Sequence, residues 1–265
     1  MKKTFLFPIC FIFLLTSPAW AFDVKKHNGE LSLGFSYITY EEPDLNVEEK
    51  GPMFGIAGSY TYHNKLMFKL EGVGSFGSLD YSSPSGDLDD ISNYMLEGRV
   101  LVGYDFHFSN SFMLTPYVGF GYRYLNDDSS GEITSRGAVG YERESNYYYS
   151  PVGLMGWAKL GQGWVMKITA EYDYFWEGKQ KTHLEDALSR APTLENKQED
   201  GYGLRGSVKF QKNYGSTSFA IEPFIRYWKI DDSEMEFFYV AGRPMVGYEP
   251  KNNSTEVGIL FSFVF

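Results

Sequence analysis

Apolar and polar residues alternate one by one along most of this chain, in stretches of 9 to 13 residues. In the clearest stretch, apolar or aromatic residues occupy every second position from Trp164 to Trp176, and charged residues such as Lys167 and Glu171 lie between them. Successive side chains of a β-strand point to opposite faces, so the pattern predicts strands with one apolar and one polar face. Ten such stretches follow one another: 30–40, 53–63, 65–77, 93–106, 112–125, 147–160, 163–177, 201–211, 217–230 and 254–265.

The connections between these stretches differ in length in a regular way. The short ones are 63–64, 108–111, 161–163 and 212–216. The long ones are acidic and comprise 41–52, 78–92, 126–146, 178–200 and 231–253. Short turns at one end and long loops at the other are typical of a transmembrane β-barrel. Within the fourth long segment, residues 182–191 (THLEDALSRA) favour a helix that would cap the barrel mouth.

A soluble β-sandwich would also alternate, so the aromatic residues decide between the two folds. Trp164 and Trp176 bracket one apolar face, and Tyr94 and Phe106 bracket another. Aromatic rings at both ends of a strand match the two interfaces of a membrane. No run of 18 apolar residues follows the first 21 residues, which excludes a protein made of membrane-spanning helices. The predicted fold is therefore an all-β, closed antiparallel transmembrane barrel of about ten strands, with short periplasmic turns and long extracellular loops.

The beginning of the chain predicts export. Residues 1–21 combine two lysines, an apolar run too short to span a bilayer, and an Ala-Trp-Ala sequence of the kind cut by signal peptidase. We expect a cleaved signal peptide at 1–21 and a single barrel domain at 22–265. The only cysteine, Cys10, lies in the predicted signal peptide, so we expect no disulfide in the mature domain.

The last strand carries the most specific pattern, because aromatic or aliphatic residues alternate up to the final residue. These are Val257, Ile259, Phe261, Phe263 and Phe265. In this respect the chain resembles the bacterial outer-membrane β-barrel superfamily, whose terminal strand ends in an aromatic residue read by the barrel-assembly machinery. The resemblance implies that these five residues form an insertion signal. It also implies a Gram-negative outer membrane, with lipid and lipopolysaccharide as neighbours, and we expect a monomer.

The polar faces of the strands carry charges of both signs, which predicts paired charges inside the barrel. The expected lumen network consists of Glu97, Arg99, Lys167, Glu171, Asp173, Arg205, Glu222 and Arg226. Eight strands leave room only for side chains, whereas 16 to 18 enclose a water-filled channel. Ten strands with many long charged side chains therefore favour a largely plugged lumen, because unpaired buried charge is costly. A narrow pore for small solutes remains the alternative.

Catalytic alternatives follow from a second resemblance. Ten-stranded barrels of this length resemble the omptin proteases, which carry an Asp-x-His sequence at the outer end of the seventh strand. Asp173 matches that aspartate, but Phe175 stands where the histidine would be. Small barrels that modify lipid A use a histidine with a serine or an acid. The four histidines, His27, His63, His107 and His183, show no recognisable spacing for this.

The acidic character of the chain and its loops limits which binding partners can be expected. A formal net charge of −10 argues against nucleic acid, which requires a basic face. Asp87, Asp89 and Asp90 offer hard oxygen ligands and form a candidate cation contact near anionic lipopolysaccharide. No phosphate loop, zinc motif or cofactor fingerprint is present, so no cofactor is expected. The favoured function is structural or surface interaction with an extracellular ligand, and a loop-borne hydrolase or a narrow pore remains the alternative.

Overall fold

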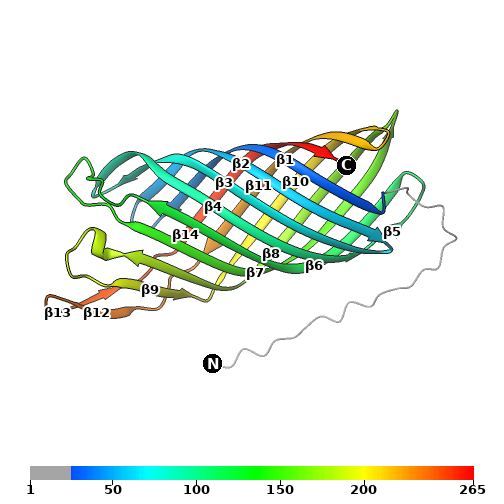
Figure 1. Ribbon diagram of the computed structural model, residues 1–265. Helices are drawn as coiled ribbons and strands as arrows, with labels where there is room; N and C mark the ends of the chain where they lie inside the picture. Colours follow the sequence, from blue (N-terminus) through cyan, green and yellow to red (C-terminus); the bar gives the residue numbers. More distant parts are fainter. Residues whose placement is uncertain (1–24) are drawn as a thin grey trace, which may run out of the picture.

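The computed structural model describes residues 25–265, so the predicted signal peptide at 1–21 lies outside the described residues. Ten long antiparallel strands form a tilted cylinder (Figure 1). They are β1 (His27–Glu42), β2 (Val47–Asn64), β3 (Leu66–Ser83), β4 (Gly86–Tyr104), β6 (Phe112–Asp128), β7 (Glu142–Gly161), β8 (Trp164–His183), β10 (Gly201–Tyr214), β11 (Thr217–Ile230) and β14 (Asn252–Val264). The smaller elements are β5 (Phe106–His107), the 3-10 helix η1 (Leu184–Asp186), β9 (Thr193–Gln198), β12 (Glu236–Val240) and β13 (Arg243–Gly247). Within these residues, no helix has the length and apolar character needed to cross a membrane.

The last strand closes the ring. β14 pairs with β11 on one side and with β1 on the other, and β10 pairs with β8 after the excursion through β9. The β1–β14 ladder runs from Glu30 opposite Val264 to Glu41 opposite Asn253, and Gly29 exchanges two backbone hydrogen bonds with Phe265. The predicted all-β fold and the closed ten-stranded barrel are confirmed.

The two ends of the barrel differ, as the connection lengths predicted. At the turn end, where β1 starts and β14 finishes, single residues such as Lys65 and Gln162 make the reversal with positive φ angles of 64° and 51°. At the loop end, the β12–β13 hairpin, β9 and the segment between β6 and β7 project beyond the ring (Figure 1).

Two of the predicted long loops are wrong in their extent. β1 and β2 continue until only residues 43–46 are left between them, and β3 and β4 leave only residues 84–85. The strands therefore extend past the stretches that show apolar alternation. The helix expected at 182–191 is also wrong, because β8 runs through His183 and only three residues of η1 are helical.

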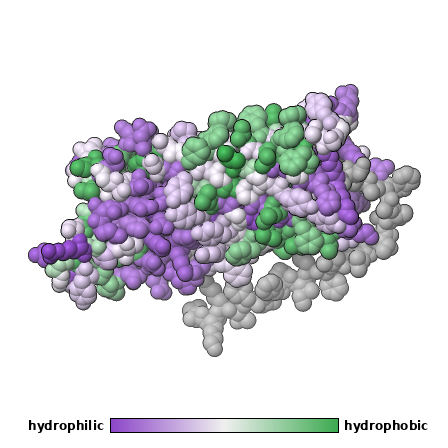
Figure 2. All heavy atoms as spheres, in the orientation of Figure 1, coloured by the Kyte–Doolittle hydropathy of each residue, from purple (hydrophilic) through white to green (hydrophobic). Residues whose placement is uncertain are grey.

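An apolar band surrounds the cylinder, because every second side chain points outward. Ile168 and Val100 lie in this band and are 47% and 53% exposed, and Figure 2 shows the band as a green zone next to a hydrophilic loop end. Towards the loop end it is bordered by an aromatic belt, which we call the outer girdle. Its members are Tyr94, Tyr122, Tyr124, Tyr148, Tyr174 and Trp176.

Arginine at Ile168 tests which face meets lipid. The change Ile168→Arg is expected to cost about 2–4 kcal/mol of folding free energy in a bilayer, because a charge would lie near the membrane midplane. Ile168→Leu keeps the apolar surface and is the matched control. Both variants can be refolded into lipid vesicles and titrated with urea. Equal stability of the two variants would contradict the assignment of this face to lipid.

Candidate functional sites in the lumen and at the loop end

The lumen is filled by buried charged side chains, and most of them are paired. Arg205 on β10 lies at its centre, where Nε is 2.6 Å from Asp173 Oδ2 and 3.2 Å from Glu171 Oε1. The same guanidinium donates two hydrogen bonds to Glu97 on β4 and one to the Tyr149 hydroxyl at 3.0 Å. β10 and β4 are not neighbours in the ring, so these bonds cross the lumen.

Arg99 on β4 extends this central cluster. Its Nη1 is 2.5 Å from Glu171 Oε1, and its Nε is 2.9 Å from Glu71 Oε1. Tyr117 donates a hydrogen bond of 2.6 Å to the other oxygen of Glu171, and Lys69 pairs with Glu71. The charge on Glu171 is thus compensated by two arginines and a hydroxyl group.

A second cluster of lysines lies nearer the turn end. Lys209 Nζ is 2.5 Å from Glu30 and 2.9 Å from Glu222, and Lys167 Nζ is 3.6 Å from Glu222. Towards the loop end, Arg226 pairs with Glu256 at 3.1 Å. The eight residues of the predicted lumen network thus all lie inside the barrel, but in these three clusters and not in one.

An aromatic layer lies next to the central cluster. Tyr147, Tyr149, Phe175, Trp228 and Ile230 pack together and are all buried. Arg123 is also buried, and its guanidinium lies 5.5 Å from the centre of the Trp228 ring. The cavities that remain around the charged clusters have volumes of about 100 and 240 Å³. Neither has the size of an open channel through the described part of the chain.

The loop end of the lumen holds a charged group that the sequence analysis missed. Arg143 on β7 donates hydrogen bonds from Nη2 to Glu42 Oε1 at 3.0 Å and to Glu249 Oε1 at 2.5 Å. Glu49 and Asp127 face the same space and line a cavity of about 60 Å³ with Arg143. Four carboxyl groups therefore surround one guanidinium. The sequence contained only a weak signal for this group, because its members come from different long segments.

The carboxyl groups of Glu49 and Asp127 lie beyond the outer girdle and have altered acidity. Burial raises the pKa of Asp127 to about 6, although the Arg143 charge opposes this effect. Burial, together with the negative charge of Asp127, raises the pKa of Glu49 well above its ordinary value. Crowding of acids in a partly desolvated space favours the protonated forms. We therefore expect the stability of this part of the barrel to depend on pH.

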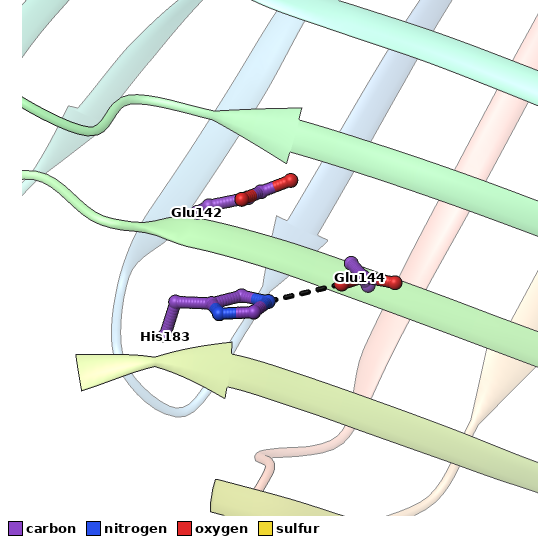
Figure 3. A group of neighbouring side chains, drawn as sticks. All are labelled: Glu142, Glu144 and His183. Atoms are coloured by element: carbon purple, nitrogen blue, oxygen red, sulfur yellow. Dashed lines mark hydrogen bonds and ion pairs between the residues drawn. The ribbon is translucent and has the colours of Figure 1, made fainter. Parts of the chain in front are cut away.

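On the outer surface of the barrel, Glu142 and Glu144 of β7 come together with His183 of β8 (Figure 3). One ligand atom from each lies within 4.8 Å of the others, and His183 Nε2 is 2.9 Å from Glu144 Oε1. By contrast, Asp87 and Asp89 have exposed side chains at the β3–β4 hairpin and do not form such a group with Asp90 among residues 25–265.

The remaining predicted positions are found as follows. Asp173 is fully buried against Arg205, and Phe175 lies in the aromatic layer, so the omptin-like segment does not line an open groove. His63 Nδ1 is 2.8 Å from Asp105 at the turn end, and His27 bonds Tyr60 there. Val257, Phe261 and Phe263 in β14, and Phe265 directly after it, are exposed on the apolar band. Their role and that of Ile259 as an insertion signal stays a prediction.

A family model described as an outer membrane protein beta-barrel domain matches residues 7–145, more than half of the chain. No curated protein sequence matches significantly. The structure of the outer membrane protease OmpT from Escherichia coli is similar, with 12% identity, a TM-score of 0.62, and coverage of 93% of this chain and 98% of that one. At this identity the likeness shows the fold alone.

Two further solved structures are more distant. The Pseudomonas putida toluene transporter TodX has 9% identity and a TM-score of 0.37, with coverage of 92% and 90% of the two chains. The translocator domain of the autotransporter NalP from Neisseria meningitidis has 9% identity and a TM-score of 0.39, with coverage of 90% and 89%. These scores are too low to support any conclusion about this chain.

Removing the central arginine is expected to destabilise the barrel strongly. Arg205→Met would leave Glu97, Glu171 and Asp173 without their shared cation, at a cost of about 3–5 kcal/mol. The control is Lys179→Met, because Lys179 pairs with Glu177 at 3.7 Å on the exposed surface and such pairs contribute less than about 1 kcal/mol. Thermal unfolding in detergent, followed by gel mobility with and without heating, measures both. Similar melting temperatures for the two variants would show that the central cluster does not contribute the expected stability to the barrel.

The loop end is expected to lose stability as pH rises. The folded-state pKa of Asp127 is raised, so its protonated form stabilises the fold below about pH 4, and this contribution disappears as pH rises through about 6. Between pH 5 and pH 7.5, Asp127 should lower the unfolding free energy of the parent by on the order of 1–2 kcal/mol. The Asp127→Asn variant should lack this part of the decrease. The measurement is urea unfolding at both pH values, with the exposed neighbour exchange Asp128→Asn as control. An identical pH dependence in Asp127→Asn and the parent would refute this assignment.

Proposed function

Because this chain belongs to the outer membrane protein β-barrel domain family and is therefore a barrel of the bacterial outer membrane, we propose that it is a non-conducting barrel whose loop end is its working surface. Its role is structural or one of surface interaction, with an extracellular ligand as partner. By the usual topology of such barrels, the turn end faces the periplasm and the loop end faces the outside.

The filled lumen carries this proposal. Ion pairs join strands across the interior, as between Arg205 and Glu97, and the aromatic layer around Trp228 lies beside them. A solute crossing the barrel would have to break these pairs, which are protected from water and compensated only by each other. The lumen is thus suited to hold the cylinder rigid and unsuited to transport.

The β12–β13 hairpin supports a role in surface interaction. One of its faces packs through Phe238 and Val240 against Ala191 and Leu194, in the segment that contains β9. On the other face, Phe237 and Tyr239 are 76% and 68% exposed, and Val246 lies opposite Phe237. An exposed aromatic face on a rigid hairpin is costly in water unless it meets a partner. The partner that fits is a protein surface with an apolar patch.

Export and insertion belong to the same proposal. Residues 1–21 act as a cleaved signal peptide in a Gram-negative cell, and the alternating residues that end at Phe265 are the signal for the barrel-assembly machinery. The mature monomer then contacts outer-membrane lipid and lipopolysaccharide through the apolar band and the outer girdle.

Planar-bilayer recording tests the closed lumen. The purified protein, reconstituted at known density, is expected to give no steady open-channel current, because the charged clusters leave only small cavities of about 100 and 240 Å³ around them. A general porin inserted under the same salt and voltage is the positive control. Swelling of vesicles in small sugars gives a second, independent readout. Steady currents of porin size, with matching sugar uptake, would replace the plugged barrel with a pore.

A further inference from the structure

The group formed by Glu142, Glu144 and His183, which we call the rim triad, has the composition of a metal site. Two carboxylates and one imidazole converge on the outer surface of the barrel near the loop end (Figure 3). From these residues we propose that the rim triad binds a divalent transition-metal ion, with Zn²⁺ as the preferred metal. This site is separate from the lumen and does not depend on the barrel being closed to solutes.

The strand register explains why the three side chains meet. Glu142 and Glu144 are two positions apart on β7, so they point to the same face of the sheet. β7 pairs with β8 so that Arg143 lies opposite Thr182, which sets His183 directly beyond that pair. The triad therefore sits on two hydrogen-bonded strands and not on a free loop. Sites on regular strands hold their ligands more accurately than sites on loops.

Each of the three ligands is held by a further partner. Tyr124 donates a hydrogen bond of 3.1 Å to Glu144 Oε2, and Asn126 donates one of 2.6 Å to Glu142 Oε1. On the other side of the imidazole, His183 Nδ1 is 3.4 Å from Glu185 Oε1. A carboxylate on one ring nitrogen directs the other nitrogen towards the metal and strengthens it as a ligand. In each carboxylate of the triad, one oxygen is held by the further partner.

The ligand set selects the class of metal. Zn²⁺ binds imidazole nitrogen and carboxylate oxygen at about 2.0–2.2 Å, with three protein ligands and water where a position is left open. The ligand atoms of the triad lie within 4.8 Å of one another. Small side-chain rotations would therefore bring all three within bonding distance of one central ion. Ca²⁺ prefers six to eight oxygen ligands, and the imidazole of His183 would be a poor substitute for one of them.

A proton competes with the metal at this site. His183 is in hydrogen-bond contact with Glu144 through Nε2 and with Glu185 through Nδ1. The other charged groups near the triad are Asp186, which accepts a hydrogen bond from the Glu142 amide at 3.1 Å, and Lys181, whose charge acts on Glu144. An imidazole must be deprotonated to bind Zn²⁺, so binding is expected to weaken at acidic pH.

The experiment uses the whole untagged protein in detergent, freed of metal with a chelator and titrated with ZnCl2 by calorimetry. We expect one Zn²⁺ per chain at pH 7.5, and at least tenfold weaker binding at pH 5.5. His183→Gln, and separately Glu142→Gln with Glu144→Gln, should weaken binding at least tenfold, which is the usual effect of removing a ligand or its support. His27→Gln is the matched control, because His27 is at the turn end and bonds Tyr60.

Two readouts keep the outcomes separate. The gel mobility shift on heating reports whether each variant is folded, so a lost site is distinguished from a lost barrel. Competition with Ca²⁺ at the same concentration reports the class of metal, and no displacement of Zn²⁺ is expected. The proposal is overturned if the parent binds no Zn²⁺, if the folded His183→Gln variant binds as tightly as the parent, or if Ca²⁺ displaces Zn²⁺ equally.

Discussion

The pairing of β14 with β1 is the constraint on which the rest of the structure depends. Backbone N–H and C=O groups that face hydrocarbon have no water to bond, so an open sheet edge inside the apolar band would cost several kcal/mol per group. The ladder from Glu30 to Glu41 removes that edge, and the two bonds between Gly29 and Phe265 extend it to the final residue. Closure fixes the ring of ten strands, and every interior contact follows from it.

The closed ring turns the ordinary arrangement of a soluble protein inside out. Alternation sends Ile168 and Val100 outward to lipid, and it sends their neighbours Lys167 and Arg99 into the lumen. A ten-stranded cylinder is narrow enough for Arg205 on β10 to reach Glu97 on β4. Charges that could not be kept singly in such a space are stable as pairs because the opposite wall supplies the partner. The polar side of each strand is therefore the core of this protein.

Much of the fold follows from the sequence, because alternation is a local property. The ten strands and the inward direction of Arg205 and Glu171 can be assigned from period two alone. The strand ends cannot, since the hydrophobic signal stops at the edge of the apolar band while the hydrogen bonding continues, as it does between Glu41 and Glu48. The ion pairs cannot be predicted, because Arg205 and Glu97 are 108 positions apart and nothing in the sequence indicates which side chains meet across the lumen.

The rim triad likewise could not be predicted from the sequence, although its members are closer together along the chain. The sequence places His183 in a long acidic segment, where a single histidine is expected to be solvated, and it gives no reason to connect it with Glu144, 39 positions earlier. Only the β7–β8 register makes them neighbours.

That register also sets two different environments within three consecutive residues. Glu142 and Glu144 point outward to His183, and Arg143 between them points inward to Glu42 and Glu249. The inward carboxyl groups gather around a fixed cation, whereas the outward ones converge on the imidazole of His183. An imidazole with two carboxylates can bind a metal ion and a guanidinium cannot, which is why we assign the metal site to the outer face of β7.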